Sequence, residues 1–474
     1  MKRTTMLKKY DCIIVGAGPA GIFAALEFAK HTKLKILLLE KGNVLEKRMC
    51  QTAKNGGVCV NCKICDNTKG WGGGGALSDG KLNVATTTIG VRMLDYMSKP
   101  DFTRLVKVAD ELWVRFGAPE NLFGIDNTEI RKIKKLCTKA KLDFKVSPIR
   151  HIGTGRSFDV LNNMYEALKS KIEIKFNSEV EEILVDDNKT VGVKLKNSKK
   201  YFADNVIVAP GREGSTWFAD ECKRLELDKV VHPVELGVRV EVPSEVMKRL
   251  TDVLYEAKIS YEGKTFNDFV RTFCMCPNGF VARERVNVGG SSIISANGHS
   301  FSDRKSENTN FAILVRSNFT APFKEPNLYG TYVTGLSNLI SSGVLVQRLG
   351  DLLAGRRSTP ERIKKGLVKP TLTDADPGDL AFALPYRHLV NIMEMLRALD
   401  KVTPGVFSFD TLLYGTEVKF FSSGPVFKKF LETQINNLYA CGDGVGVSSN
   451  LVHASVSGLL VAEYIVNKIK EKGK

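Results

Sequence analysis

The chain has 474 residues, of which 43% are hydrophobic and 26% are charged, and its formal net charge is +17. This composition is that of a globular protein, so a mainly disordered or fibrous chain is excluded, and the length indicates two or three domains. No stretch reaches the roughly 18 to 20 uninterrupted apolar residues that a membrane span needs, so we expect no integral membrane association. The positive charge is compatible with a nucleic acid as a partner, although a lysine-rich surface explains it more simply.

The N-terminal segment has a pattern that can indicate a secretory signal, because basic residues precede a mostly apolar run over residues 12–26. Gly16, Gly18, Pro19 and Gly21 interrupt this run, and a buried strand followed by a turn explains it better. Several of the ten cysteines are isolated at apolar positions, which is typical of reduced thiols. We therefore predict a cytoplasmic protein.

The first predicted strand, residues 11–15, leads directly into a glycine-rich turn and a helix, and a second buried strand ends at Glu40. In this turn Gly16 permits the tight bend, Gly18 lets a pyrophosphate approach the backbone, and Gly21 lets the helix pack on the strand. The N–H groups and the dipole of the helix N-terminus favour the diphosphate. Glu40 would accept hydrogen bonds from the hydroxyls of an adenosine ribose. Together these elements predict a dinucleotide-binding unit.

Four cysteines lie close together in the next segment, at positions Cys50, Cys59, Cys62 and Cys65. Four thiols at this spacing can hold zinc or an iron–sulfur cluster. We predict a metal site at these residues. Dithiol redox chemistry and unligated thiols remain alternatives, because spacing alone gives no geometry.

The densest glycine run of the chain follows at Gly72 to Gly75. Backbone without side chains suits close approach to a flat or phosphorylated ligand. Ser78 and Asp79 could cap a following helix or hydrogen-bond such a ligand. A flexible surface linker is the alternative interpretation.

The middle of the chain contains a basic stretch and then a series of short strands. Residues 86–145 have a helical and basic pattern, and the cations are most concentrated from Arg131 to Lys145. We expect a solvated face there, with RNA contact as the alternative. Residues 216–400 alternate in hydrophobicity over short segments, which predicts an antiparallel sheet and a substrate-binding domain. Within a polar run between two of these strands, His299 could transfer a proton, although an ordinary polar loop is equally compatible.

The cofactor is indicated near the C-terminus, where residues 437–444 form a strand that ends in the pair Gly442 and Asp443. This segment resembles the C-terminal motif of FAD-dependent oxidoreductases of the glutathione-reductase structural type. The resemblance implies that Asp443 holds the ribityl chain or the pyrophosphate, and that the last helix directs its N-terminal dipole at the flavin ring. Residues 203–211 resemble the strand and turn that return to the FAD domain, and Val180 lies where such proteins contact the adenine. No second motif of this kind follows a strand, so we expect no separate NAD(P)H-binding domain.

Motifs across nearly the whole chain resemble the uncharacterised FAD-dependent dehydrogenases of bacteria and archaea. The matching segments are residues 16–21, 59–82, 151–156, 237–243, 270–277, 297–310 and 413–417. The resemblance implies an FAD-binding oxidoreductase without an established substrate. Lys419 departs from the family pattern, since an arginine is expected there, and residues 447–450 replace a more glycine-rich loop.

The expected fold is α/β, with a Rossmann-type FAD-binding domain around a parallel sheet and an inserted, mainly antiparallel α+β substrate domain. The predicted FAD-binding domain is discontinuous and comprises residues 1–85, 146–215 and 401–474. Residues 86–145 form the predicted helical basic insert, and residues 216–400 form the predicted substrate or cap domain.

We expect a hydride to be exchanged between flavin N5 and an unidentified small molecule, in a crevice between the FAD-binding domain and the inserted sheet. The residues expected to bind FAD are Gly16, Gly18, Pro19, Ala20, Gly21, Glu40, Lys41, Arg48, Gly74, Gly75, Ser78, Asp79, Gly80, Val180, Ala209, Gly211, Gly442, Asp443, Gly444, Asn450 and Leu451. The predicted catalytic residues are His299, Glu417 and Lys419. Electrons would come from transiently bound NAD(P)H, from the substrate, or from a redox partner protein through the cysteine cluster. A flavin-dependent RNA-modifying enzyme and a non-catalytic flavin- or metal-binding protein are the alternatives.

Overall fold

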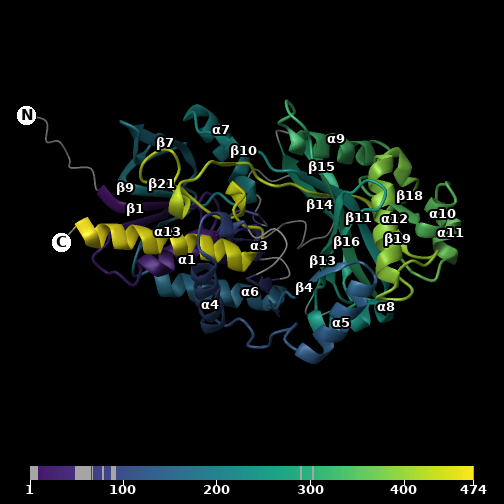
Figure 1. Cartoon of the computed structure of the whole chain (residues 1–474). Helices are drawn as coiled ribbons and strands as arrows, with labels where there is room; N and C mark the ends of the chain where they lie inside the picture. The colour runs from purple at the N-terminus through teal and green to yellow at the C-terminus, as the bar shows by residue number, and fades with distance from the viewer. Residues whose placement is uncertain are drawn as a thin grey trace, which may run out of the picture.

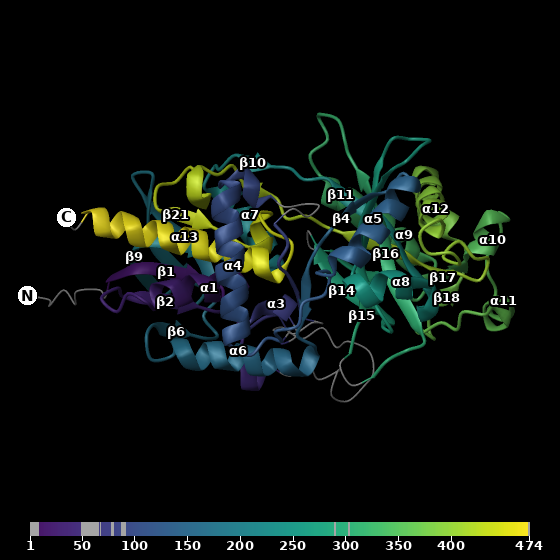
Figure 2. The same cartoon turned by 60° about the horizontal axis from the view of Figure 1, so that its bottom comes forward.

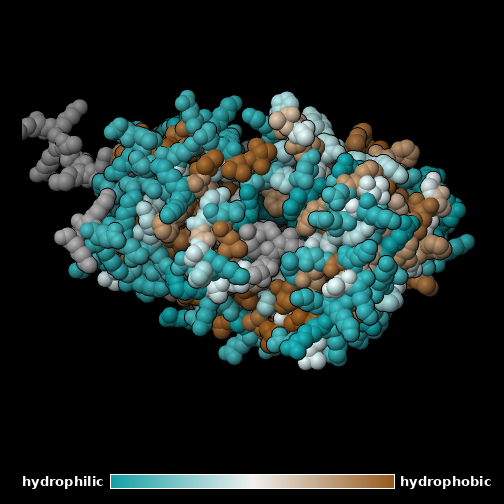
Figure 3. Space-filling model, viewed as in Figure 1, coloured by the Kyte–Doolittle hydropathy of each residue, from teal (hydrophilic) through white to brown (hydrophobic). Residues whose placement is uncertain are grey.

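The computed structural model of the chain describes residues 9–48, 66, 68–76, 80–86, 92–288, 291–301 and 304–472. The described chain forms two bodies, each built around a large sheet of its own, one with seven strands and the other with eight. Figure 1 shows the first body on the left, with the first strand and the last helix, and the second body on the right. On the face shown in Figure 3, hydrophilic residues cover most of both bodies.

The sheet of the first body is mainly parallel. Its parallel strands, in their order across the sheet, are β6 (Glu173–Lys175), β2 (Ile36–Leu39), β1 (Lys9–Val15), β9 (Lys200–Val208) and β21 (Leu438–Ala440). An antiparallel hairpin of β7 (Val180–Asp186) and β8 (Lys189–Leu195) pairs with the first part of β9. The parallel sheet and its βα crossover confirm the Rossmann-type domain that the sequence predicts.

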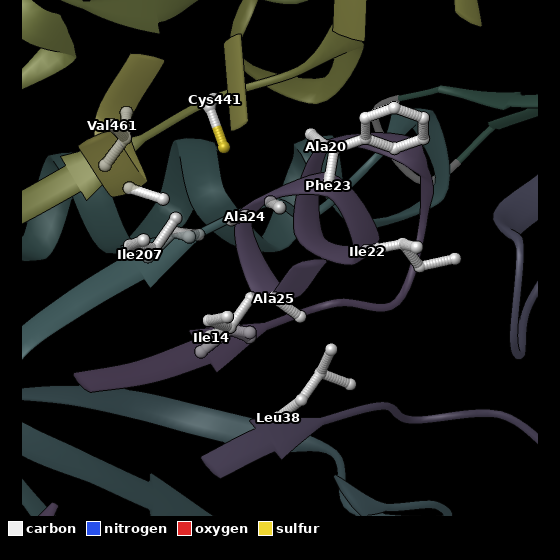
Figure 4. Packing of buried hydrophobic residues seen from close by; sticks show 14 of the residues in the cluster. Ile14, Ala20, Ile22, Phe23, Ala24, Ala25, Leu38, Ile207, Cys441 and Val461 are labelled. Atoms are coloured by element: carbon white, nitrogen blue, oxygen red, sulfur yellow. The ribbon is translucent and has the colours of Figure 1, made fainter. Parts of the chain in front are cut away.

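Helix α1 (Pro19–Phe28) lies between this sheet and the last helix, α13 (Leu451–Lys472). Figure 4 shows apolar side chains of β1 and β2 below α1, and Val461 of α13 on its other side. A Cβ on Gly458 of α13 would lie only 1.9 Å from the carbonyl oxygen of Ala20 in α1, so the two helices meet at their backbones. Strands β1 and β2 are covered on both faces, which explains their continuous apolar sequences.

The sheet of the second body is mainly antiparallel. In their order across the sheet, its strands are β18 (Asp376–Pro377), β17 (Leu345–Arg348), β19 (Leu412–Lys419), β11 (Val234–Pro243), β16 (Asn308–Ser317), β13 (Phe269–Cys276), β12 (Lys258–Glu262) and β4 (Asp143–Lys145). The described strands pair antiparallel except for β17 and β18. Their apolar side chains share a core with α5 (Asn127–Lys139), α8 (Ser244–Leu254) and α12 (Tyr386–Asp400). The antiparallel α+β domain is therefore present as predicted.

Shorter elements connect or cover the two sheets. Three small sheets pair β3 (Lys81–Asn83) with β5 (Ile149–His151), β10 (Lys229–Val230) with β20 (Gly424–Pro425), and β14 (Phe280–Val288) with β15 (Ser291–His299). The other helices are α3 (Gly73–Ala76), α4 (Lys99–Arg115), α6 (Thr154–Leu168), α7 (Ser215–Arg224), α9 (Pro326–Leu339), α10 (Leu349–Leu353) and α11 (Pro360–Lys365). No helix within the described ranges is long and apolar enough to cross a membrane.

The arrangement of the chain differs from the expected domain boundaries in two places. The stretch 86–145, expected as one insert, is divided, because Phe102 of α4 packs in the core of the first body and Ile133 of α5 in that of the second. Figure 2 shows α4 across the first body and α5 on the second. Strand β19 pairs with β11 of the second sheet, although the sequence placed residues 401–474 in the FAD-binding domain. Both differences result from pairings between distant segments, which leave no local periodicity in the sequence.

The basic stretch from Arg131 to Lys145 begins on α5, which is amphipathic. Ile133 and Cys137 face the core, whereas the cations along the helix are exposed. Within this stretch Lys132 forms an ion pair with Glu129 at 2.6 Å. These observations agree with a solvated helix face, and RNA contact stays the alternative prediction.

Candidate functional site

Glycine turns from distant parts of the chain meet at the carboxyl ends of β1, β9 and β21. A Cβ on Gly16 would lie 2.2 Å from the carbonyl oxygen of Ala209, and a Cβ on Gly444 would lie 2.1 Å from that of Gly211. Gly16 also has a φ of +103°, which other residues rarely adopt. The sequence therefore requires glycine at these positions so that the turns after the strands can touch. The structure brings together the predicted cofactor-binding residues of the three turns.

Two glycines of these turns face open space instead of neighbouring backbone. A Cβ on Gly18 or on Gly211 would meet no atom within 4 Å. Helix α1 begins beside Gly18 with Pro19 in its first turn, and no side chain caps its N-terminus. The leading N–H groups of the helix are thus available to an anion in a space that side chains leave open. This cradle fits the diphosphate of FAD.

Glu40 has a structural role that the sequence did not predict. The side chain is 6% exposed, and its Oε2 accepts a hydrogen bond from the N–H of Ala17 at 2.8 Å. Its Oε1 accepts from the N–H of Gly42 at 2.8 Å and of Gly70 at 3.0 Å. A carboxylate has about four acceptor positions, so about one is left for a ribose hydroxyl. Glu40 therefore joins three backbone segments around the place where the ribose is expected.

The described part of the glycine-rich segment, residues 68–76, is packed against the first glycine turn. The N–H of Gly72 donates to the carbonyl oxygen of Ala17 at 2.8 Å, and a Cβ on Gly73 would lie 3.2 Å from the Cα of Gly18. The guanidinium of Arg48 donates to the carbonyl oxygen of Gly73 at 3.1 Å. These contacts pack the described part of the segment against the first glycine turn. They disagree with the flexible linker that the sequence allowed as an alternative.

The remaining predicted cofactor-binding residues lie around the same turns or outside the described part of the chain. Burial lowers the pKa of Lys41 beside the end of β2. Gly74 and Gly75 belong to α3, Gly80 precedes β3, and Val180 begins β7. Ser78, Asp79 and the four clustered cysteines Cys50, Cys59, Cys62 and Cys65 lie outside the described residues. Within the described ranges, no group of three or more His, Cys, Asp or Glu side chains could hold a metal ion.

Asp443 lies in the short helical turn that follows β21. Its Oδ1 accepts a hydrogen bond from the hydroxyl of Ser448 at 2.6 Å, and its Oδ2 lies 3.6 Å from Nε of Arg212. Asn450 accepts a hydrogen bond from the N–H of His453 at 2.8 Å, so its side chain caps α13 just before Leu451. Arg212 adds a cation to this turn that sequence reasoning missed.

Strand β19 of the second body contributes Glu417, which is buried against Arg239 of β11. The guanidinium of Arg239 is 0% exposed, and its Nη1 lies 3.3 Å from Oε1 of Glu417. The Nε of Arg239 donates to Oδ1 of Asn310 at 2.9 Å, which fixes the side chain. Burial raises the pKa of Glu417 to about 8, because Arg239 offsets the loss of solvent only in part. Below about pH 8 Glu417 can therefore hold a proton.

Lys419, two residues further along β19, is buried without a polar partner. Its side chain is 7% exposed, and within the described part of the chain its Nζ makes no hydrogen bond or ion pair. The Nζ lies 5.3 Å from the ring centre of Phe273 and 5.9 Å from that of Phe421. Burial, together with the nearby charge of Arg212, lowers the pKa of Lys419 to about 7, and Asp443 opposes this shift. Lys419 thus lies within electrostatic range of the glycine turn that contains Asp443.

His299 ends β15 at the edge of the same polar network. A Cβ on the preceding Gly298 would lie 1.9 Å from Nη2 of Arg239, so the backbone of β15 passes directly over the guanidinium. The ring of His299 lies 6.0 Å from that of Phe301. The structure therefore places His299 near Arg239, and its proton-transfer role stays a prediction.

Further charged residues of this region were not singled out as site residues in the sequence. Glu235 accepts hydrogen bonds from Arg271 at 2.6 Å and from Arg316 at 3.1 Å. Burial alone would raise the pKa of Glu235, but the two arginines hold it below its usual value. Lys81 of β3 donates to the carbonyl oxygen of Met275 at 2.8 Å and so joins the first body to β13. Lys81 and Arg271 lie in segments that resemble the family, whereas Glu235 and Arg316 lie outside those segments.

Two family models match the chain at the places where these features lie. Residues 11–60 match a model described as FAD binding domain, and residues 233–420 match one described as FAD-dependent protein, C-terminal domain-like. The chain therefore contains segments that match an FAD binding domain and the C-terminal domain of FAD-dependent proteins. The predicted resemblance to FAD-dependent proteins is thereby confirmed. The role of the cradle as the FAD site stays a prediction. Since FAD serves proteins as a carrier of hydride and electrons, the chain is an FAD-dependent oxidoreductase.

Individual proteins also resemble this FAD-dependent protein. An uncharacterized protein of Clostridium beijerinckii is 28% identical over 482 residues, which cover 96% of this chain and 80% of that protein. A quinol fumarate reductase FrdA of E. coli is 14% identical with a TM-score of 0.40, over 98% of this chain and 71% of that one. A 3-ketosteroid-delta4-(5alpha)-dehydrogenase of Rhodococcus jostii RHA1 is 12% identical with a TM-score of 0.44, over 98% of both chains.

Proposed function

We propose that the protein exchanges a hydride between FAD and a small molecule that binds between the glycine turns and strand β19. FAD supplies the hydride chemistry when it is bound. The observation that carries the proposal is the buried ammonium of Lys419, which has no polar partner in the described part of the chain and is sensitive to the charges of Arg212 and Asp443. A buried charge without a partner lowers stability and is typical of a site that a ligand completes.

The first body holds the cofactor in this proposal. The N-terminus of α1 and the open faces of Gly18 and Gly211 bind the diphosphate, as their geometry allows. Glu40 positions the three backbone segments around the ribose and accepts one hydroxyl hydrogen bond. Asp443 accepts hydrogen bonds from the ribityl chain, held in place by Ser448.

The second body holds and moves the proton. With a pKa of about 7, Lys419 is present in both protonation states near neutral pH, which suits a general acid or base. Glu417, two residues before Lys419 on β19, has a pKa of about 8 and carries a second proton. Arg239 positions the carboxyl group of Glu417. The rings of Phe273 and Phe421 exclude water from the ammonium. The substrate therefore contacts the protonated amine of Lys419 at a surface of the crevice from which water is excluded.

The test is the reduction potential of the bound flavin, which requires no knowledge of the substrate. Lys419→Met removes a positive charge and should lower the potential by about 30 mV or more, equivalent to about 1.4 kcal/mol for a two-electron couple. Lys419→Arg keeps the charge at every pH and should therefore keep the wild-type reduction potential near neutral pH. Its plot of potential against pH should lack any inflection near pH 7. An unchanged potential in Lys419→Met, with normal FAD content, would show that Lys419 does not face the flavin.

The electron donor is identified separately, by anaerobic stopped-flow reduction with NADH and with NADPH. We propose transient NAD(P)H binding, and bleaching of the flavin by either nucleotide supports it. If neither nucleotide bleaches the flavin, the donor is the substrate or a redox partner protein.

A further inference from the structure

Strand β13 ends in the sequence Cys274-Met275-Cys276 with an irregular backbone. The register to β16 shifts between Phe273 and Cys276, and Cys274 has a φ of +45°. A bulge of this kind re-aims the side chains of the strand. The Nζ of Lys81 lies 4.0 Å from Sγ of Cys274 and 3.7 Å from Sγ of Cys276. Both sulfur atoms therefore point at one ammonium group and lie on the same side of the strand.

Two cations from different elements surround these thiols. In addition to Lys81, Arg239 directs its Nη2 at Sγ of Cys276, at 3.7 Å. Cations next to a cysteine stabilise the thiolate, the form that reacts. Cys276 is completely buried, whereas Cys274 is half-buried.

The thiol of Cys276 is also tied to the residue that carries the other thiol. A hydrogen bond to Cys274, together with burial, raises the pKa of Cys276 well above its usual value, although Lys81 and Arg239 oppose this shift. The Sγ of Cys276 donates a hydrogen bond to the carbonyl oxygen of Cys274 at 3.6 Å, which holds the Cys276 side chain against that residue. Two thiols that are two residues apart and lie beside the same cation have the arrangement of a reactive dithiol.

The other described cysteines provide the contrast. Cys12, Cys137, Cys222 and Cys441 are buried. Burial raises the pKa of the Cys12 thiol well above its usual value and that of each of the other three to about 12. No such residue has an arginine or lysine nitrogen within hydrogen-bond distance of its sulfur among the described contacts. They are packing residues, whereas the pair on β13 lies beside Arg239, the partner of Glu417.

We propose that Cys274 and Cys276 form a redox-active pair that exchanges two electrons with the bound FAD. In the oxidation two S–H bonds break and one Sγ–Sγ bond forms, which releases two electrons and two protons. Oxidised FAD accepts both electrons and one proton, and the other proton goes to solvent. The reverse reaction reduces the disulfide and reoxidises the flavin. This proposal depends on the proposed function only in that FAD must occupy the cradle of the first body.

Peptide mapping gives the direct readout of the thiols. Trypsin cuts after Arg271 and Arg283, and the peptide between them contains Cys274 and Cys276 as its only cysteines. The holoenzyme is oxidised in air, unfolded in the presence of an alkylating reagent, and digested. We expect this peptide unalkylated and lighter by the mass of two hydrogens, and alkylated at both cysteines after treatment with dithiothreitol.

An anaerobic dithionite titration tests the link to the flavin. The wild type should take up two electrons more per FAD than Cys276→Ser, and Cys274→Ser should show the same loss. Cys222→Ser removes a thiol from α7, outside the network, and should match the wild type. The FAD content of each variant is measured in the same samples, so a folding defect is distinguished from a lost redox pair.

The possible outcomes separate the two proposals. If FAD binds and is reduced but the peptide is fully alkylated after oxidation, the cysteine pair is not redox-active and the proposed function stands. If the disulfide forms but electron uptake is equal in the wild type and both variants, the pair does not exchange electrons with the flavin, and the inference is overturned. A protein that cannot be reconstituted with FAD contradicts the proposed function itself.

Discussion

Replacing Lys419 by methionine should make the FAD-free protein more stable, because the buried ammonium is unfavourable without a partner. Lys419 is 7% exposed, and burial lowers its pKa from 10.5 to about 7. A lowering of this size means that the folded protein disfavours the charged form of Lys419 by about 5 kcal/mol relative to the unfolded chain. The unfolded chain binds this proton more tightly than the folded chain does. The contribution of Lys419 to the free energy of unfolding is therefore most unfavourable below about pH 7, and it becomes less unfavourable as the pH rises toward 10.5.

Methionine has a similar length and no charge, so it removes this penalty. It also removes the contacts of the cation with the rings of Phe273 and Phe421, which are worth about 2 kcal/mol when desolvated. We expect a net gain of about 3 kcal/mol below pH 7. For a domain of roughly 150 to 250 residues this gain raises the midpoint of thermal unfolding by about 6–12 °C.

The measurement is thermal unfolding of FAD-free Lys419→Met and wild type, followed by circular dichroism at pH 6 and at pH 9.5. The gain should be large at pH 6 and small at pH 9.5, because the wild-type lysine is largely neutral at the higher pH in the folded state and its penalty has mostly disappeared. Lys134→Met, on the exposed face of α5, is the control and should change stability by no more than about 0.5 kcal/mol. A variant that unfolds at or below the wild-type temperature at pH 6 would refute this account of Lys419.

The remaining predictions concern the cofactor, the second titrating group, the basic helix and the cysteine cluster. Gly18→Ala should fold normally and lose FAD affinity in fluorescence titrations, whereas Gly16→Ala should also unfold at lower temperature, because its Cβ would lie 2.2 Å from a carbonyl oxygen. Burial raises the pKa of Glu417 from 4.5 to about 8, so wild-type stability should fall as the pH rises through that window, and Glu417→Gln should remove this component in denaturation curves. If residues 131–139 only form a solvated face, gel shifts with tRNA should show no complex at moderate salt; retention that weakens steeply with salt would favour the RNA alternative. An anaerobic absorption spectrum should show flavin bands, and additional broad absorption that dithionite bleaches and Cys62→Ser removes would support the iron–sulfur hypothesis.

The sequence alone determined the nucleotide-binding half of the site, because its signals are local. One βαβ unit contains the buried first strand, the glycines from Gly16 to Gly21, and Glu40 at the end of the next strand. The pair Gly442 and Asp443 is similarly defined by the strand before it and the helix after it. Such short-range patterns indicate both the fold and the cofactor, since the backbone geometry that they require is the geometry that binds a diphosphate.

The tertiary structure decided which side chains of the second body come together. Arg239 and Glu417 are 178 positions apart and meet only because β11 and β19 are neighbours in the sheet. Lys81 reaches Cys274 over 193 positions, from a strand of the other body. The sequence offered Glu417 and the segment 270–277 through a family resemblance, but it contained no sign that Arg239 pairs with Glu417 or that Lys81 lies beside the two cysteines of β13. Contacts of this kind depend on the order of strands in a sheet and on how two bodies pack, and neither leaves a periodic pattern along the chain.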